Sequence, residues 1–149
     1  MINLDKEMTV EPTVTALLEE YVSCLDRRAG QAWLDLFAPH GYYAVLREEE
    51  FEQANNVLLV GEDMKRLTAR VVSGLERDTR RMVHTLGPVR SDSGRTRATA
   101  PFTVWMEGVP AYCGFYLIDL DSTEKGLRIG RCQVVLFSKL VQTPIFLPI

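Results

Sequence analysis

His84 is the residue of this sequence with the clearest capacity for acid–base chemistry. It lies in the apolar stretch MVHTL, and an imidazole titrates near neutral pH, as a general acid or base must. Tyr21, Asp26 and Asp35 supply the hydroxyl and carboxyl groups that a proton-transfer site would need beside it. The simpler interpretation, which we prefer, is that His84 forms a local hydrogen bond or lies at a subunit contact.

Neither aspartate is an obvious partner for that imidazole. Asp35 falls on the polar side of a short predicted helix, away from the apolar residues that would face a pocket. Asp26 lies at the end of a longer predicted helix beside Arg27 and Arg28, and we expect an ion pair there. A proton-transfer site therefore stays an alternative interpretation.

Apolar residues at helical spacing predict the elements that would position these groups. The first helix begins at Pro12, which suits a first turn, and its apolar stripe is Val14, Leu17, Leu18, Tyr21, Val22 and Leu25. A second, two-turn helix is expected over residues 32–37, because Pro39 forbids its continuation. A third helix is predicted over residues 62–75, where apolar residues again recur at three and four positions.

From Met82 onward the apolar period changes from 3.6 to 2, which indicates strands. The expected strands are residues 41–47, 55–61, 82–91 with a break at Gly87-Pro88, 96–107, 111–120 and 127–140. Between them, EEEFE at 48–52 is expected to be an acidic loop, residues 76–81 a charged turn, and His40 part of an exposed turn.

The last two strands carry apolar residues on both faces. Val134, Leu136 and Leu140 lie on one side of the final strand, and Val135 and Phe137 lie on the other. Such a strand needs two covers. The helices supply one cover, and we expect another subunit to supply the second. The interface candidates are Trp105, Tyr112, Tyr116, Val135 and Phe137.

Helices followed by strands indicate an α+β fold. We expect three N-terminal helices to pack on one face of a curved, mixed or antiparallel sheet. If that sheet curls around the helices, it forms a cone that can enclose a cavity. The inward-facing residues Ala98 and Ala100 are small and would leave room for one.

Composition is that of an ordinary globular protein. The chain has 149 residues, 46% hydrophobic and 25% charged, with a net charge of −3, so nucleic-acid or anionic-membrane binding is not expected. Residues 1–11 are expected to form a flexible arm, and residues 12–149 one domain. No secretory signal and no apolar run of the ~20 residues that span a membrane is visible in the sequence, so we expect a cytoplasmic protein.

Three cysteines, Cys24, Cys113 and Cys132, are far apart in the sequence. They form no CxxC pair, and their odd number does not suit a disulfide framework. All three have apolar neighbours in sequence, so we expect buried thiols that act as small apolar side chains.

The stretch YVSCLDRRAGQAWLDLFAPHGYYAV resembles the opening of the NTF2-like superfamily, with a long helix, W-x-x-L-F and an aromatic first strand. Within it, the chain resembles the small (beta) subunits of Rieske-type aromatic-ring-hydroxylating dioxygenases, and terephthalate dioxygenase is the nearest in kind. The helix GEDMKRLTARVVSGL, the Arg81-x-x-His84 pair and the end TPIFLPI carry this resemblance together with Trp33, Phe37 and Tyr43.

The resemblance implies a structural subunit. In that family the large alpha subunit holds a Rieske [2Fe-2S] cluster and a mononuclear Fe(II), and beta subunits form a trimer within an alpha3beta3 complex. It implies an oxidoreductase of aromatic catabolism, acting on an aromatic carboxylate, whose electrons come from NAD(P)H through a reductase. For this chain it implies no catalytic residue, no cofactor and no metal.

A count of metal ligands agrees with that division of labour. A Rieske cluster takes two histidines besides two cysteines, and a non-haem oxygenase iron takes two more. This chain has two in all, His40 and His84, so it cannot hold both centres.

Two alternatives stay open. NTF2-like dehydratases and isomerases can line the cone with a histidine, an acid and a tyrosine, for which His84, Tyr21, Asp26 and Asp35 are the candidates here. The other alternative is a cone that binds a small ligand or only oligomerises.

Overall fold

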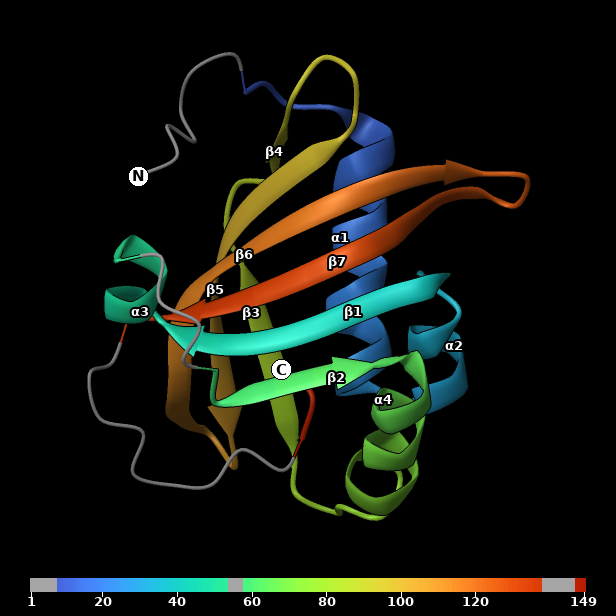
Figure 1. Cartoon of the computed structure of the whole chain (residues 1–149). Coiled ribbons are helices and arrows are strands. Elements are labelled where there is room, and N and C mark those ends of the chain that lie inside the picture. Colours follow the sequence, from blue (N-terminus) through green and yellow to red (C-terminus); the bar gives the residue numbers. More distant parts are fainter. Residues whose placement is uncertain (1–7, 54–57, 138–146) are drawn as a thin grey trace.

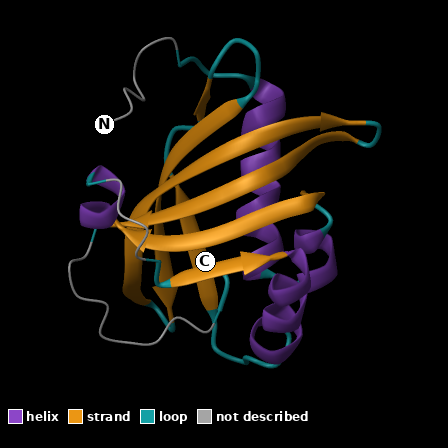
Figure 2. Ribbon diagram, in the orientation of Figure 1, coloured by secondary structure: helices purple, strands orange, loops and turns teal. Residues whose placement is uncertain are grey.

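The computed structural model describes residues 8–53, 58–137 and 147–149, and these form a seven-stranded sheet that curves around a long helix (Figures 1 and 2). The strand order is β2-β1-β7-β6-β5-β3, and β4 pairs with β5. The strands are β1 Phe37–Arg47, β2 Val60–Asp63, β3 Met82–Leu86, β4 Arg90–Ser91, β5 Arg97–Met106, β6 Val109–Thr123 and β7 Gly126–Leu136. The sheet is mixed, because β1 and β7 are parallel while the other pairs are antiparallel.

The helices are α1 Pro12–Asp26, α2 Gly30–Leu34, α3 Glu48–Glu52, α4 Met64–Arg70 and the π-helical turn η1 Val71–Leu75. α1 lies behind strands β1, β6 and β7, with α2 and α4 beside its lower end (Figure 1). The predicted stripe of α1 is confirmed, since Val14, Leu18, Tyr21, Val22 and Leu25 are buried. The Glu11 carboxylate caps α1 by accepting the main-chain N–H groups of Thr13 and Val14.

Two expectations near β1 are wrong. The second helix occupies Gly30–Leu34 rather than residues 32–37, and Phe37 already belongs to β1. Pro39 is tolerated in this strand because the β1–β7 register is irregular between Phe37 and Tyr42, so no regular ladder bond is lost there. EEEFE is the short helix α3 rather than a loop, and its three glutamates favour the positive end of the helix.

Most of the other elements follow the sequence, but β2 occupies Val60–Asp63 and shares only residues 60–61 with the strand expected at 55–61. α4 and η1 together cover most of the helix expected over residues 62–75, and the strand expected at 82–91 is broken into β3 and β4. On β5 the inward residues Ala98, Ala100, Phe102 and Val104 are buried, as their alternation predicts. Residues 55–57 of the expected strand 55–61, and residues 138–140 of the last one, lie outside the described residues.

An aromatic cluster fills the concave side of the sheet. Trp33 lies edge-on to Tyr21, Phe37 and Tyr43, with ring centroids 5.5, 4.9 and 5.7 Å apart. Tyr116 extends the cluster by stacking on Phe102, with centroids 4.2 Å apart. Edge-to-face and offset contacts of this kind add to the free energy of apolar burial, so this cluster is the centre of the core.

The convex face of the sheet is partly covered by α3. Phe51 of α3 lies edge-on to Phe115 of β6, 5.6 Å between centroids, and Phe115 lies 5.9 Å from Phe137. Leu117 and Val135 are buried on this face. Phe137 keeps 46% of its surface exposed, so an apolar area is left beside α3.

Candidate functional site

The end of α1 and the centre of β3 meet through Asp26 and His84. The Nδ1 atom of His84 lies 2.6 Å from Asp26 Oδ1. The main-chain N–H of His84 also donates to both carboxylate oxygens of Asp26, at 3.1 and 3.0 Å. A carboxylate only accepts hydrogen bonds, so Nδ1 carries a proton and the other ring nitrogen, Nε2, is an acceptor when the imidazole is neutral.

The His84 side chain is fully buried, and its Nε2 has no hydrogen-bond partner among the described residues. The Tyr116 hydroxyl is likewise buried and without a partner in that part of the chain. Burial raises the pKa of Tyr116, and the charge of Asp26 adds to the shift. The concave side of the sheet therefore holds a neutral phenol and an aspartate-bound imidazole, the types of group that proton transfer uses.

Two other interior tyrosines, Tyr21 and Tyr43, form hydrogen bonds with the last residue, Ile149. The main-chain oxygen of Ile149 accepts hydrogen bonds from Tyr21, at 2.9 Å, and from Tyr43, at 3.2 Å. The Ile149 N–H donates to the Tyr43 hydroxyl at 3.0 Å. Leu147 and Ile149 are 6% and 1% exposed, so this segment fills space inside the cone. Burial raises the pKa of both Tyr21 and Tyr43.

The four residues of the proton-transfer alternative are thus only partly brought together. Asp26 and His84 form a pair, but the Tyr21 hydroxyl binds Ile149. Asp35 lies at the exposed end of α2, where it accepts a hydrogen bond from Gln31 at 2.8 Å. It has no contact with the pair.

The expectation that Asp26 forms an ion pair with Arg27 or Arg28 is wrong. Arg27 pairs with Glu20 at 2.8 Å, and Arg28 reaches Asp78 at 3.4 Å. Arg28 turns away because it has a positive φ of 59°, which reverses the chain after α1. His40 is exposed as expected, but in β1 rather than in a turn, with Nε2 2.8 Å from Asp121.

The interface candidates divide into exposed and buried residues. Trp105 is 37% exposed, and its indole N–H donates to Thr85 at 3.1 Å. Tyr112 is half-buried against the core, while Phe137 is exposed. Tyr116 and Val135 need correction, because both are fully buried within the chain and offer no surface to a partner.

The expectation for the cysteines holds for two of the three. Cys24 and Cys132 are buried, and burial raises their pKa values to about 11 and about 12. Cys113 is exposed, because it lies on the convex side of β6 between Tyr112 and Gly114. Because β6 is apolar on both faces, the alternation of its residues does not predict which face the core covers, and so does not predict that Cys113 is exposed.

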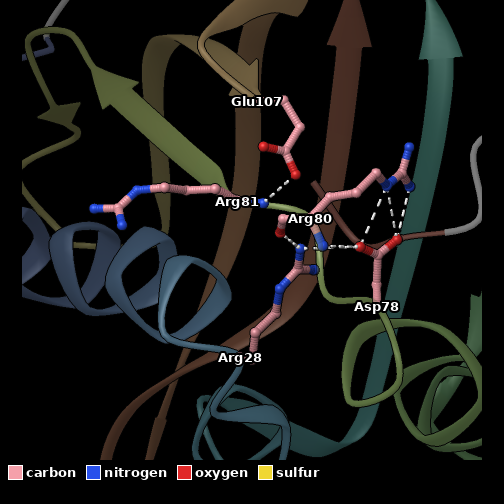
Figure 3. A network of polar contacts seen from close by, with 5 residues as sticks. All are labelled: Arg28, Asp78, Arg80, Arg81 and Glu107. Carbon is pink, nitrogen blue, oxygen red and sulfur yellow. Dashed lines mark hydrogen bonds and ion pairs between the residues drawn. The ribbon is translucent and has the colours of Figure 1, made fainter.

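A network of polar contacts lies at the turn between η1 and β3 (Figure 3). The sequence predicts only that this turn is charged. The Asp78 carboxylate accepts from Arg80 through Nε, at 3.0 Å, and Nη2, at 2.7 Å. Arg28 donates to the Arg80 carbonyl and approaches the same carboxylate. On the other side, Glu107 accepts the Arg81 N–H at 3.0 Å. The turn is therefore fixed to both α1 and β5.

Within the described ranges, no group of three histidine, cysteine or acidic side chains is placed to hold a metal ion. No helix there is long and apolar enough to cross a bilayer.

No protein-family model and no curated protein matches this sequence. Solved structures do match its fold. The proposed beta subunit of an aromatic-ring-hydroxylating dioxygenase from Novosphingobium aromaticivorans has a TM-score of 0.79 and 20% identity, over 93% of this chain and 95% of that one. The beta subunit of benzoate 1,2-dioxygenase from Burkholderia mallei has a TM-score of 0.68 and 18% identity, over 94% and 99%.

A proposed scytalone dehydratase from Novosphingobium aromaticivorans also matches, with a TM-score of 0.67 and 9% identity, over 85% of this chain and 83% of that one. Identities this low show the fold alone. The fold is that of the NTF2-like, cystatin-like proteins, as the sequence predicts.

Proposed function

We propose that this chain is the non-catalytic beta subunit of a Rieske-type aromatic-ring-hydroxylating oxygenase that acts on an aromatic carboxylate. Its task is assembly, in a beta trimer that supports three alpha subunits in the cytoplasm. The iron centres belong to the alpha subunit, and NAD(P)H is the ultimate source of electrons.

The observation that carries this proposal is the state of the cone interior. In a catalytic cone the interior tyrosines and the histidine would face a substrate. Here two of the tyrosines bind the chain's own Ile149, and the imidazole is shut off from solvent. The structural match to two dioxygenase beta subunits over nearly the whole of both chains supports the same function.

The iron centres of such an oxygenase do not fit the residues of this chain. Its two histidines are used separately, His40 by Asp121 on the surface and His84 by Asp26 in the interior. Neither has a second histidine or a cysteine within a common ligand set among the described residues. The chain's contribution is therefore the shape and charge of its surface.

Co-expression tests the proposal. The chain produced alone should be colourless, iron-free and inactive toward aromatic carboxylates. Produced with a large subunit encoded beside it, which would carry a C-x-H…C-x-x-H motif, it should elute as a brown complex of equal stoichiometry. A chain that stays separate from that subunit, while the subunit folds and turns over substrate alone, would refute the proposal.

A second candidate, a dehydratase or isomerase, is favoured by one observation. The Asp26–His84 pair leaves Nε2 without a partner in the described structure, as a general base would have before substrate binds. In that case the isolated chain should turn over a small hydroxy or carbonyl compound. His84→Ala should abolish turnover, and Asp35→Ala should leave it unchanged.

A further inference from the structure

A groove with a volume of about 740 Å³ lies along α4 and η1, and neither Asp26 nor His84 is among the residues that line it. Its wall residues combine arginines, two acids and small side chains: Glu62, Arg66, Ala69, Arg70, Ser73, Gly74, Arg77, Asp78, Arg80 and Leu147. The acids and arginines alternate with residues too small to fill the groove.

The helix itself sets the spacing of these residues. Arg66 and Arg70 fall at i and i+4 on α4, and Arg77 follows the π-helical turn η1; all three line the same groove. Ala69, Ser73 and Gly74 lie between the arginines, so another backbone can approach the helix closely.

The groove is positively charged although the chain is not. Four arginines against two carboxylates give 4 − 2 = +2, whereas the whole chain carries −3. Glu62 is taken by Arg70 at 2.5 Å, and Asp78 by Arg80. The guanidinium groups of Arg66 and Arg77 have no ion pair or hydrogen bond within the described residues, and both residues are exposed.

The lower end of the groove is fixed in place. Two guanidinium nitrogens of Arg80 bind the Asp78 carboxylate, and Arg28 holds the main-chain carbonyl of Arg80 (Figure 3). The side chain of Arg81 points to the opposite side of the turn in the same view. Arg80 therefore loses little conformational entropy when an anion binds beside it, which favours recognition of carboxylates.

We propose that this arginine groove binds an acidic segment of the large subunit, an assignment that rests on the proposed function. Four arginines line one groove, which is more positive charge than one small anion needs and suits two or more carboxylates along a peptide. The small residues admit the backbone of that segment, and the unpaired charges of Arg66 and Arg77 supply its specificity and speed its association.

Charge reversal tests the assignment in the co-expressed complex. Arg66→Glu/Arg77→Glu should weaken binding of the large subunit roughly tenfold or more and reduce the dependence of the dissociation constant on salt. Lys65→Glu/Arg90→Glu is the matched control, since it changes net charge equally. Both control residues are exposed, Lys65 on α4 but outside the groove and Arg90 on β4. The control should change binding by less than about twofold.

The outcomes separate this assignment from the proposed function. If the groove variant and the control bind the large subunit with equal affinity, the groove assignment is wrong. The proposed function still stands in that case, provided that the parent chain forms the complex. If the parent chain forms no complex, both are overturned. If the groove variant instead loses self-association, a second copy occupies the groove and the assignment is wrong. Should the glutamate variant fail to fold, Arg66→Gln/Arg77→Gln should give a smaller loss in the same direction.

Discussion

The carboxylate of Asp26 binds both the main-chain N–H and the ring Nδ1 of His84, 58 residues further along the chain. The last residue of α1 thereby fixes the middle of β3 to the helix. The main-chain bonds orient the carboxylate, and the carboxylate in turn fixes the imidazole. This double contact explains a buried histidine without requiring catalysis, and it makes Asp26 a residue on which the fold depends.

Asp26→Ala should therefore destabilise the protein by about 1–3 kcal/mol, because a buried N–H and a buried imidazole lose their acceptor. Urea unfolding followed by circular dichroism measures the change. Asp35→Ala is the control, since Asp35 bonds only its neighbour Gln31 at the surface. Equal stability of the two variants would show that the Asp26–His84 contact contributes little.

Gly114 should not tolerate a side chain. A Cβ atom there would lie 1.8 Å from the carbonyl oxygen of Val135 on the neighbouring strand β7, and backbone cannot move aside cheaply. Gly114→Ala is expected to cost about 1–3 kcal/mol or to prevent folding. Gly94→Ala is the control, because the nearest atom to its Cβ would be 3.6 Å away. A Gly114→Ala protein with the parent's unfolding midpoint would contradict the close β6–β7 contact.

The spacing of apolar residues predicts which face of a helix or strand is buried. It does not predict contacts between elements that are distant in the sequence. The stripe of α1 and the alternation of β5 identified most of their buried residues, since each follows from local geometry. The Asp26–His84 pair did not follow, because nothing local says that the end of α1 lies against β3. Tyr116 is assigned to an interface for a different reason: β6 is apolar on both faces, and alternation alone does not say which face the core covers.

The arginine groove could not be predicted from the sequence, for a further reason. The helix expected over residues 62–75 is predicted from the spacing of its apolar residues, which says nothing about its arginines. Arg66 and Arg77 become a feature only when the turn at Asp78 and Arg80 closes the groove beside them. Surface charge has no period that distinguishes a binding groove from ordinary exposed residues.

Thiol reactivity should distinguish the three cysteines. Burial raises the pKa of Cys24 to about 11 and that of Cys132 to about 12, so almost no thiolate forms at about pH 8 in the native state. Cys113 is exposed. An aromatic disulfide reagent should label one thiol quickly in the native protein and three after unfolding. Cys113→Ser should remove the fast phase, and a second fast thiol in that variant would contradict the burial of the other two.

The Asp78–Arg80 contact should affect how the free energy of unfolding depends on pH in the acid range. Hydrogen bonds from Arg80 hold the pKa of Asp78 below its ordinary value. Because the folded pKa is the lower one, this stabilisation is fully present above the unfolded pKa near ~4 and is lost as pH falls through the folded pKa.

Asp78→Asn is accordingly expected to lower stability by about 1 kcal/mol at neutral pH and to flatten the loss below pH ~4. Urea midpoints measured from about pH 2.5 to 7 test this. A residual slope should persist, because the pKa of Asp92 is also lowered by its bonds to Thr96 and Arg97, which outweigh its burial. Glu124→Gln, at an exposed turn, should reproduce the parent curve. An unchanged acid limb in Asp78→Asn would exclude the contact in solution.

Removing residues 147–149 should open the cone. Leu147 and Ile149 are buried, and their loss should cost roughly 3–5 kcal/mol of apolar burial. It would also leave the hydroxyls of Tyr21 and Tyr43 without their main-chain partner. The truncated protein should unfold at lower urea and bind an apolar fluorescent dye that the parent excludes. Tyr43→Phe should cost only about 1 kcal/mol and admit no dye, because the segment still fills the space. A truncated protein that keeps the parent's midpoint and excludes the dye would show that these residues do not close the cone.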